Sequence, residues 1–279
     1  MTKKHLSCLF ETNIVGGTMN NGKQGKNATT PGERQGAILH YLTEKGFASV
    51  AVLAEEFSVS EMTIRRDLAE LEKQRVLQRT YGGATVYDSA FFEVSLQAKT
   101  TQFVEEKRRI GKAASDLVKD GDIVILDAGS TTMLVAKFLK TKRITVITNA
   151  LNVAADLSDC PDIQIYVAGG HLRQGVLAIV GPETAAFFEN IRADKMFMGA
   201  EGIDIRGGVM VPDPTEAHTK RAMVNSAKEV IVVADHSKIG RSTLSTIVPL
   251  AKVAALITGY EAESAQLDEL RTYVEITVV

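Results

Sequence analysis

Apolar residues between positions 33 and 74 follow a helical period. They recur at three- and four-residue steps over 33–46, and again in the segments that follow Ser49 and Ser60, which suit helix N-caps. This pattern predicts three helices. The last of them, 61–74, carries an apolar stripe that should face inward and consists of Ile64, Leu68 and Leu71.

The pattern changes after residue 75. Two short runs rich in strand-forming residues, 76–81 and 84–87, flank the pair Gly82-Gly83 and predict a β-hairpin. Three helices followed by a hairpin wing predict an α+β winged helix-turn-helix domain over residues 31–88.

Beyond residue 107, short apolar runs alternate with helical segments. A helix over 107–118 leads into them, and continuous β-branched runs of this kind are typical of a parallel sheet covered on both faces. The predicted strands are 123–126, 144–147, 163–167, 196–198, 230–233 and 254–257. We expect an α/β domain with a mainly parallel sheet over 107–279. Residues 89–106 are weakly patterned and suit a linker, and residues 1–30, rich in Asn and Gly, suit a disordered tail.

Composition narrows the class of protein. The 279 residues are 45% hydrophobic and 24% charged, which suits a folded chain of two domains. The net charge of −2 argues against a protein that coats nucleic acid by bulk charge. Cys8 and Cys160 indicate neither a disulfide framework nor a metal site, and no cofactor motif is present. Glu11 interrupts a short apolar start, and no run is long enough for a membrane span, so we expect a cytoplasmic protein without membrane contact.

The predicted helix 61–74 leaves Thr63, Arg65 and Arg66 on its outer surface. Arginine can bond guanine O6 and N7 with both arms of its guanidinium, and a helix N-terminus favours a phosphate. These features favour a helix that enters the major groove of double-stranded DNA. The candidate DNA-binding residues are Ser60, Met62, Thr63, Arg65, Arg66, Arg79, Gly82 and Gly83. The alternative is a protein-interaction module in which both arginines pair with neighbouring carboxylates.

Polar and glycine-rich segments follow the predicted strands of the second domain. Ligands bind beyond the carboxyl ends of parallel strands, where helix N-termini offer backbone amides to an anion. Because cations, carboxylates, amides and hydroxyls all occur there, we expect a pocket for a polyhydroxylated phosphate. The candidate residues are Asp127, Gly129, Ser130, Thr131, Thr132, Asn149, Gly169, Gly170, Arg173, Gly199, Glu201, Lys220 and Lys238. The alternative for the Ser-Thr segment is simple capping of the next helix.

Both regions resemble the DeoR family of helix-turn-helix repressors. In the first domain the resemblance rests on Arg34, Ile38, Leu42, Ser60, the segment 63–68, Leu71-Glu72 and the segment 81–84. In the second it rests on the segments 126–132, 148–149, 169–173, 199–204 and 234–238. The resemblance implies that Thr63, Arg65 and Arg66 contact operator DNA, that Asp67 supports the helix, and that a sugar phosphate controls binding. Segments 129–134 and 191–194 look most like members of the sugar-alcohol, galactitol type.

The family is also implied to share ancestry with ribose-5-phosphate isomerase. At two positions where the isomerase carries an aspartate and a lysine, this chain has Met198 and Arg206, and neither can perform the same proton transfer. Glu216 matches a further acidic position of the isomerase, but one carboxylate is not a catalytic set. We therefore expect a regulator and not an enzyme, with an isomerase-like enzyme or a sensor of protein partners as alternatives. We also expect a homo-oligomer, because one small winged helix offers few DNA contacts.

Overall fold

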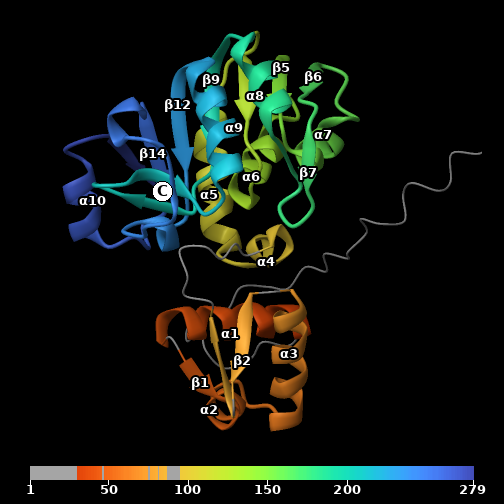
Figure 1. Ribbon diagram of the computed structural model, residues 1–279, viewed down its shortest axis with the longest axis vertical. Helices are drawn as coiled ribbons and strands as arrows, with labels where there is room; N and C mark the ends of the chain where they lie inside the picture. Colours follow the sequence, from red (N-terminus) through yellow and green to blue (C-terminus); the bar gives the residue numbers. More distant parts are fainter. Residues whose placement is uncertain (1–29, 46, 75, 81, 87–94) are drawn as a thin grey trace, which may run out of the picture.

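The computed structural model describes residues 30–45, 47–74, 76–80, 82–86 and 95–279. Most of the tail expected over 1–30, Tyr81 of the wing and the first part of the linker lie outside these residues. The described chain forms two domains, one above the other in Figure 1.

The N-terminal domain contains the three predicted helices and a three-stranded antiparallel sheet of order β1-β3-β2. Its elements are α1 (Pro31–Lys45), β1 (Phe47–Ser49), α2 (Val50–Glu56), α3 (Glu61–Lys73), β2 (Leu77–Thr80) and β3 (Gly83–Val86). The hairpin prediction is confirmed, and β1 is an addition. Three residues are too short to show a period of two, so the sequence pattern did not reveal this strand.

Side-chain caps explain where two of these helices begin. Ser49 Oγ accepts a hydrogen bond from the backbone N–H of Val52 at 3.2 Å, and Ser60 Oγ accepts one from Thr63 at 3.1 Å. The predicted stripe of α3 is fully buried and packs with apolar residues of α1 and α2. The helices predicted for this domain are therefore confirmed.

The C-terminal domain is built on a sheet of seven parallel strands in the order β15-β14-β12-β9-β4-β5-β6. The strands are β4 (Ile123–Leu126), β5 (Ile144–Thr148), β6 (Ile163–Val167), β9 (Ala193–Met198), β12 (Ala227–Val233), β14 (Ala255–Thr258) and β15 (Glu275–Val278). The predicted parallel α/β fold is confirmed, with β15 added at one edge.

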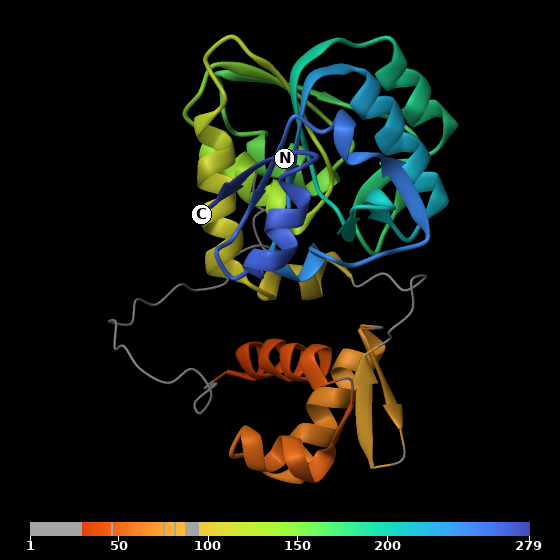
Figure 2. The same ribbon diagram turned by 90° about the vertical axis from the view of Figure 1, so that its left-hand side faces the viewer.

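Helices cover both faces of this sheet (Figures 1 and 2). One face packs against α5 (Val104–Asp116), α6 (Ser130–Leu139) and α7 (Leu151–Leu157). The other packs against α8 (Pro182–Glu189), α9 (Pro214–Asn225) and α10 (Ser264–Leu270). Successive residues of one strand serve opposite faces, as Val124 and Ile125 do. Two smaller antiparallel sheets, β7 (His171–Arg173) with β8 (Ala178–Val180), and β10 (Gly202–Asp204) with β11 (Gly208–Val211) and β13 (Ser245–Val248), complete the domain.

The strand order reverses between β4 and β9. From β4 the chain proceeds outward through β5 and β6, and it then returns to β9 and continues through β12, β14 and β15 on the other side. In open parallel sheets such a reversal leaves a crevice beyond the carboxyl ends of the two central strands, where ligands bind.

The segment expected to be a linker, 89–106, is partly helical. Ser95 caps helix α4 (Leu96–Thr101), and α5 already begins at Val104. Leu96 and Ala98 are buried, so α4 is held by packing. We correct the expected linker accordingly for residues 96–106. In Figure 1, α4 lies on the side of the C-terminal domain that faces α1.

Within the described ranges, no helix is long and apolar enough to cross a membrane.

Candidate functional site

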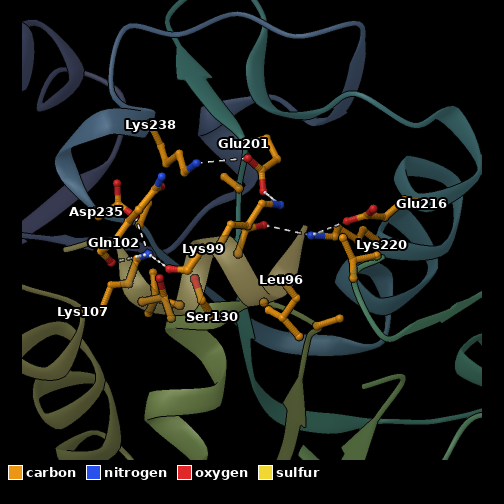
Figure 3. Close-up of a pocket in the computed structure, with 18 residues that line it drawn as sticks. Leu96, Lys99, Gln102, Lys107, Ser130, Glu201, Glu216, Lys220, Asp235 and Lys238 are labelled. Atoms are coloured by element: carbon orange, nitrogen blue, oxygen red, sulfur yellow. Dashed lines mark hydrogen bonds and ion pairs between the residues drawn. The ribbon is translucent and has the colours of Figure 1, made fainter. Parts of the chain in front are cut away.

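A pocket lies at the point where the strand order reverses. The segments that follow β4, β9 and β12 line it, together with α4 and α9 (Figure 3). Its lining is rich in charge, with the ammonium groups of four lysines and three carboxylates. The charged lining residues are Lys99, Lys107, Lys220, Lys238, Glu201, Glu216 and Asp235.

Lys220 of α9 is the centre of one charged group. Its Nζ lies 2.7 Å from Asp127 Oδ2 and 3.1 Å from Glu216 Oε1, and it donates a hydrogen bond to the Gly199 carbonyl at 3.1 Å. Burial alone would lower the pKa of Lys220, but the two carboxylates outweigh that effect and raise it above its usual value. Asp127 also accepts the backbone N–H of Gly199 at 3.0 Å, which ties the ends of β4 and β9 together.

Glu201 is the centre of a second group. Its carboxylate pairs with Lys99 of α4 through one oxygen and with Lys238 through the other, the latter at 3.1 Å. Burial would raise the pKa of Glu201, but Lys238 and Lys99 lower it well below its ordinary value. Glu201 is therefore a carboxylate anion shared by two ammonium groups from different parts of the fold.

Lys107 of α5 is the most weakly paired of the pocket lysines. Its Nζ lies 3.5 Å from Asp235 Oδ2 and donates to the backbone carbonyls of Lys99 and Gln102 at 2.7 and 2.9 Å. Burial lowers the pKa of Lys107, and Asp235 only partly offsets this.

Ser130 and Thr131 line the pocket from the first turn of α6. The N-cap residue is Gly129, which has no side chain to close the helix start. Figure 3 shows Ser130 beneath Lys99, in the pocket that Lys107 also lines. Hydroxyls, a helix N-terminus and ammonium groups thus meet in one cavity, an arrangement suited to an anion.

The structure brings seven of the thirteen expected pocket residues into the lining: Gly129, Ser130, Thr131, Gly199, Glu201, Lys220 and Lys238. Asp127 lies behind it as the partner of Lys220. Thr132 and Asn149 are fully buried and bond backbone carbonyls, of Gly129 and Ile179 respectively.

The remaining expected residues lie outside this lining. A Cβ on Gly170 would fall 2.1 Å from Thr184 Oγ1, so this glycine serves close packing, and Gly169 precedes it. Arg173 of β7 pairs with Glu216 and lies 3.6 Å from Asp213. It therefore contacts Glu216, a lining carboxylate, without being part of the lining itself.

Sequence reasoning missed the contributions of Leu96, Lys99, Gln102 and Lys107. The first three belong to a segment that looked like a linker, and Lys107 is the first residue of the predicted helix 107–118, which carried no visible motif. The signal that was present is Ser95 followed by Leu96, a cap ahead of an apolar residue.

The outer surface of α3 carries the candidate DNA-contacting side chains. Arg65 and Arg66 are exposed, as is Met62 at 69%, and Thr63 is half-buried with its hydroxyl 2.9 Å from Ser60 Oγ. Arg65 pairs with Glu61 at 3.3 Å, and both side chains are 54% exposed. Buried Asp67 accepts bonds from Arg34 at 2.5 Å and from Gln35 at 3.2 Å, which matches the supporting role that the family resemblance implies.

The wing residues have separate roles in the free protein. Gly82 is exposed with φ of 85°, a conformation that favours glycine. A Cβ on Gly83 would lie 2.3 Å from the Ala48 carbonyl, so this glycine permits β3 to approach β1. Arg79 pairs with Glu72 at 2.8 Å on the exposed side of β2.

Both domains match known families. Residues 34–90 match the DeoR-like helix-turn-helix domain, and residues 102–260 match the DeoR C terminal sensor domain. The second match alone spans more than half of the chain. The two domains therefore define a helix-turn-helix regulator with a sensor domain.

The chain is similar to known regulators over most of their own length. The chain is 36% identical to the glycerol-3-phosphate regulon repressor of Escherichia coli K12 over 227 residues, 81% of this chain and 90% of the relative. It is 32% identical to the lactose phosphotransferase system repressor of Staphylococcus aureus over 247 residues, 88% of this chain and 98% of the relative. It is also 34% identical to the HTH-type transcriptional regulator GlpR of Haloferax volcanii, with 89% and 97% covered. The chain belongs to the DeoR family of transcriptional regulators, and the isomerase-like alternative is not favoured.

Among solved structures, ribose 5-phosphate isomerase A of Methanocaldococcus jannaschii matches with 19% identity and a TM-score of 0.35, covering 47% of this chain and 52% of the isomerase. The probable sor operon regulator of Shigella flexneri matches with 14% identity and a TM-score of 0.38, covering 60% and 88%. These scores are too low to transfer any property from either structure.

Proposed function

We propose that this protein is a cytoplasmic DNA-binding repressor of a carbohydrate-utilisation operon, controlled by a phosphorylated sugar or sugar alcohol that binds the pocket. The observation that carries the proposal is the pocket's position and charge. It lies at the reversal of the strand order and combines four lysines with the N-terminus of α6.

The pocket chemistry suits a phosphate joined to a polyol. Ser130, Thr131 and the α6 amides offer donors to phosphate oxygens, and the lysines offer charge. Glu216 offers an acceptor to sugar hydroxyls. The relatives' names, with glycerol 3-phosphate and a lactose phosphotransferase system, support this ligand class.

The surface of α3 supports operator binding. Arg65 and Arg66 are exposed on one side of α3, and the exposed pair between Arg65 and Glu61 is easily exchanged for a base or phosphate. Arg79 can exchange Glu72 for a phosphate in the same way, with Gly82 at the wing. Thr63 and the arginines then contact the major groove, and the wing follows the backbone.

We also propose that the protein acts as a homo-oligomer. One winged helix in a chain of net charge −2 offers few contacts, and a two-fold dimer would double them on a palindromic operator. Light scattering on the full chain, with and without operator DNA, measures this assembly directly.

The decisive experiment measures how tightly the protein binds DNA from the promoter region of its own gene, by fluorescence anisotropy at a fixed salt concentration. Glycerol 3-phosphate, galactitol 1-phosphate and fructose 6-phosphate are added in turn, with the unphosphorylated compounds as matched controls. We expect at least one phosphorylated compound to weaken binding, and its unphosphorylated control to do nothing. Sequence-selective binding that no phosphorylated compound alters would contradict the sensor assignment.

A further inference from the structure

Helix α4 has two buried faces, and each of them contacts a different domain. Leu96 and Lys99, three residues apart and so on one face, line the pocket, and Gln102 at the end of the helix joins them. Ala98 instead belongs to the apolar core of the helix-turn-helix domain. The carbonyl of Thr101 lies against Gly36 of α1, 3.6 Å from the position that a Cβ would take. A movement of α4 therefore acts on the pocket and on α1 together.

Two lysines of the pocket fix α4 in place. Lys99 itself pairs with Glu201, which also holds Lys238. Lys107 donates to the carbonyls of Lys99 and Gln102, at the C-terminal end of α4. The groups that should attract an anion are thus the same groups that dock this helix (Figure 3).

We propose that Glu201 is a built-in competitor of the effector's phosphate. Without effector, its carboxylate occupies the ammonium groups of Lys99 and Lys238 and so docks α4. A bound phosphate takes over these two partners and repels the Glu201 carboxylate. Helix α4 then exchanges its attachment to Glu201 for one to the phosphate, moves from its docked position and changes its contact with α1. This regulation rests on the proposed function, since it takes the pocket to be the effector site.

The physical argument is one of mutually exclusive partners. A ligand can shift a conformational equilibrium only by binding two arrangements differently. The pair of ammonium groups attracts one compact anion strongly, and a second anion beside it is repelled at short range. The position of α4 that Glu201 holds and the bound phosphate therefore oppose each other, and the coupling must act in both directions.

The test compares two variants of the full-length protein that affect docking alike but ligand binding oppositely. Glu201→Gln removes the competitor, and Lys99→Gln removes a partner of both anions. The ligand probe is inorganic phosphate, measured by isothermal titration calorimetry. Docking is measured without ligand, as amide hydrogen exchange of residues 96–101. Gln97→Ala, on the exposed side of α4, is the matched control.

We expect Glu201→Gln to bind phosphate about tenfold more tightly and Lys99→Gln about tenfold more weakly, a typical size for allosteric coupling. Both should speed amide exchange in α4 and weaken operator binding without ligand, and Gln97→Ala should change neither. Weaker phosphate binding in Glu201→Gln would overturn the competitor role. Unchanged exchange in both variants would overturn the docking role.

A charge-balanced double variant, Lys99→Gln with Glu201→Gln, guards against simple misfolding. It should unfold cooperatively, as measured by circular dichroism, and its α4 amides should still exchange faster than those of the wild type. Exchange as slow as in the wild type would contradict the proposal. Failure of the proposed function looks different: no phosphorylated compound would alter operator binding of the wild-type protein. The exchange measurements use no ligand and would still decide whether Glu201 docks α4.

Discussion

The cations of α3 and those of the pocket occupy opposite environments. Arg65 and Glu61 are both 54% exposed, whereas Lys220 and Asp127 are 3% and 0% exposed. Exposed ion pairs contribute little to folding stability and exchange partners readily. A buried ion that loses its partner destabilises the fold strongly. The outer surface of α3 can therefore exchange its ion pairs for DNA contacts at a low cost in free energy. The pocket can admit only a ligand whose charge replaces the charge of the side chain that it displaces.

Removing a buried cation should lower the free energy of unfolding more than any other substitution considered below. Lys220→Met leaves Asp127 and Glu216 without their shared partner, and we expect a loss of about 3–5 kcal/mol in the free energy of unfolding. Urea unfolding measures it. Lys112→Met is the matched control, because Lys112 pairs with Asp116 on the surface, where both are more than half exposed. Its effect should stay near the value of about 0–1 kcal/mol that is typical of exposed pairs. Equal losses in the two variants would show that burial does not separate the regions.

Removing the exposed arginines should have the reverse profile. We expect Arg65→Ala with Arg66→Ala to weaken operator binding by about 1–3 kcal/mol for each base that an arginine reads, with little change in thermal stability. The control is Lys73→Ala, an exposed cation at the far end of α3. Anisotropy and thermal melts distinguish the two effects. Operator affinity that falls equally in the control would indicate bulk electrostatics instead of a reading helix.

The same contrast explains what the sequence could predict. The apolar stripe of α3 follows a helical period, and the strands of the sheet are continuous β-branched runs, so these two patterns indicated both domains. Strand-end residues such as Ser130 and Glu201 were found because parallel strands bring their carboxyl ends to one edge. Lys99 and Lys107 approach that edge from α4 and α5, which precede the first strand of the sheet. Their place depends on tertiary packing, and a six-residue helix that shares its faces between two domains shows no single period.

His236 is less exposed than Arg65 and less buried than Lys220, and its ion pair with Glu106 should make the protein's stability depend on pH. Its Nδ1 lies 2.8 Å from Glu106 Oε2, and its ring contacts Phe103, which also contacts His40 of α1. The bond to Glu106 raises the pKa of His236 despite its partial burial, and Asp235 and Glu261 act in the same direction. The stabilisation is therefore complete below about pH 6.5, the ordinary histidine value, and is lost as pH rises through the raised pKa.

Unfolding free energies measured from about pH 6 upward should accordingly fall more steeply for the wild type than for His236→Asn. His171→Gln, which alters an exposed histidine of β7, should keep the wild-type slope. Identical slopes in all three proteins would show that His236 does not contribute to the pH dependence of stability.

The smallest expected effect lies where the two regions meet, at Gly36 of α1. Its missing Cβ would be in ordinary contact distance, 3.6 Å, from the Thr101 carbonyl of α4. Alanine there should therefore fit and stabilise the N-terminal domain by about 0.5–1 kcal/mol, because glycine weakens a helix interior. Leucine adds atoms beyond that Cβ, which lies next to α4, so we expect Gly36→Leu to lack this gain and to speed amide exchange in α4. Thermal melts and exchange of the two variants measure this, and similar α4 exchange in both would mean that α1 and α4 move independently.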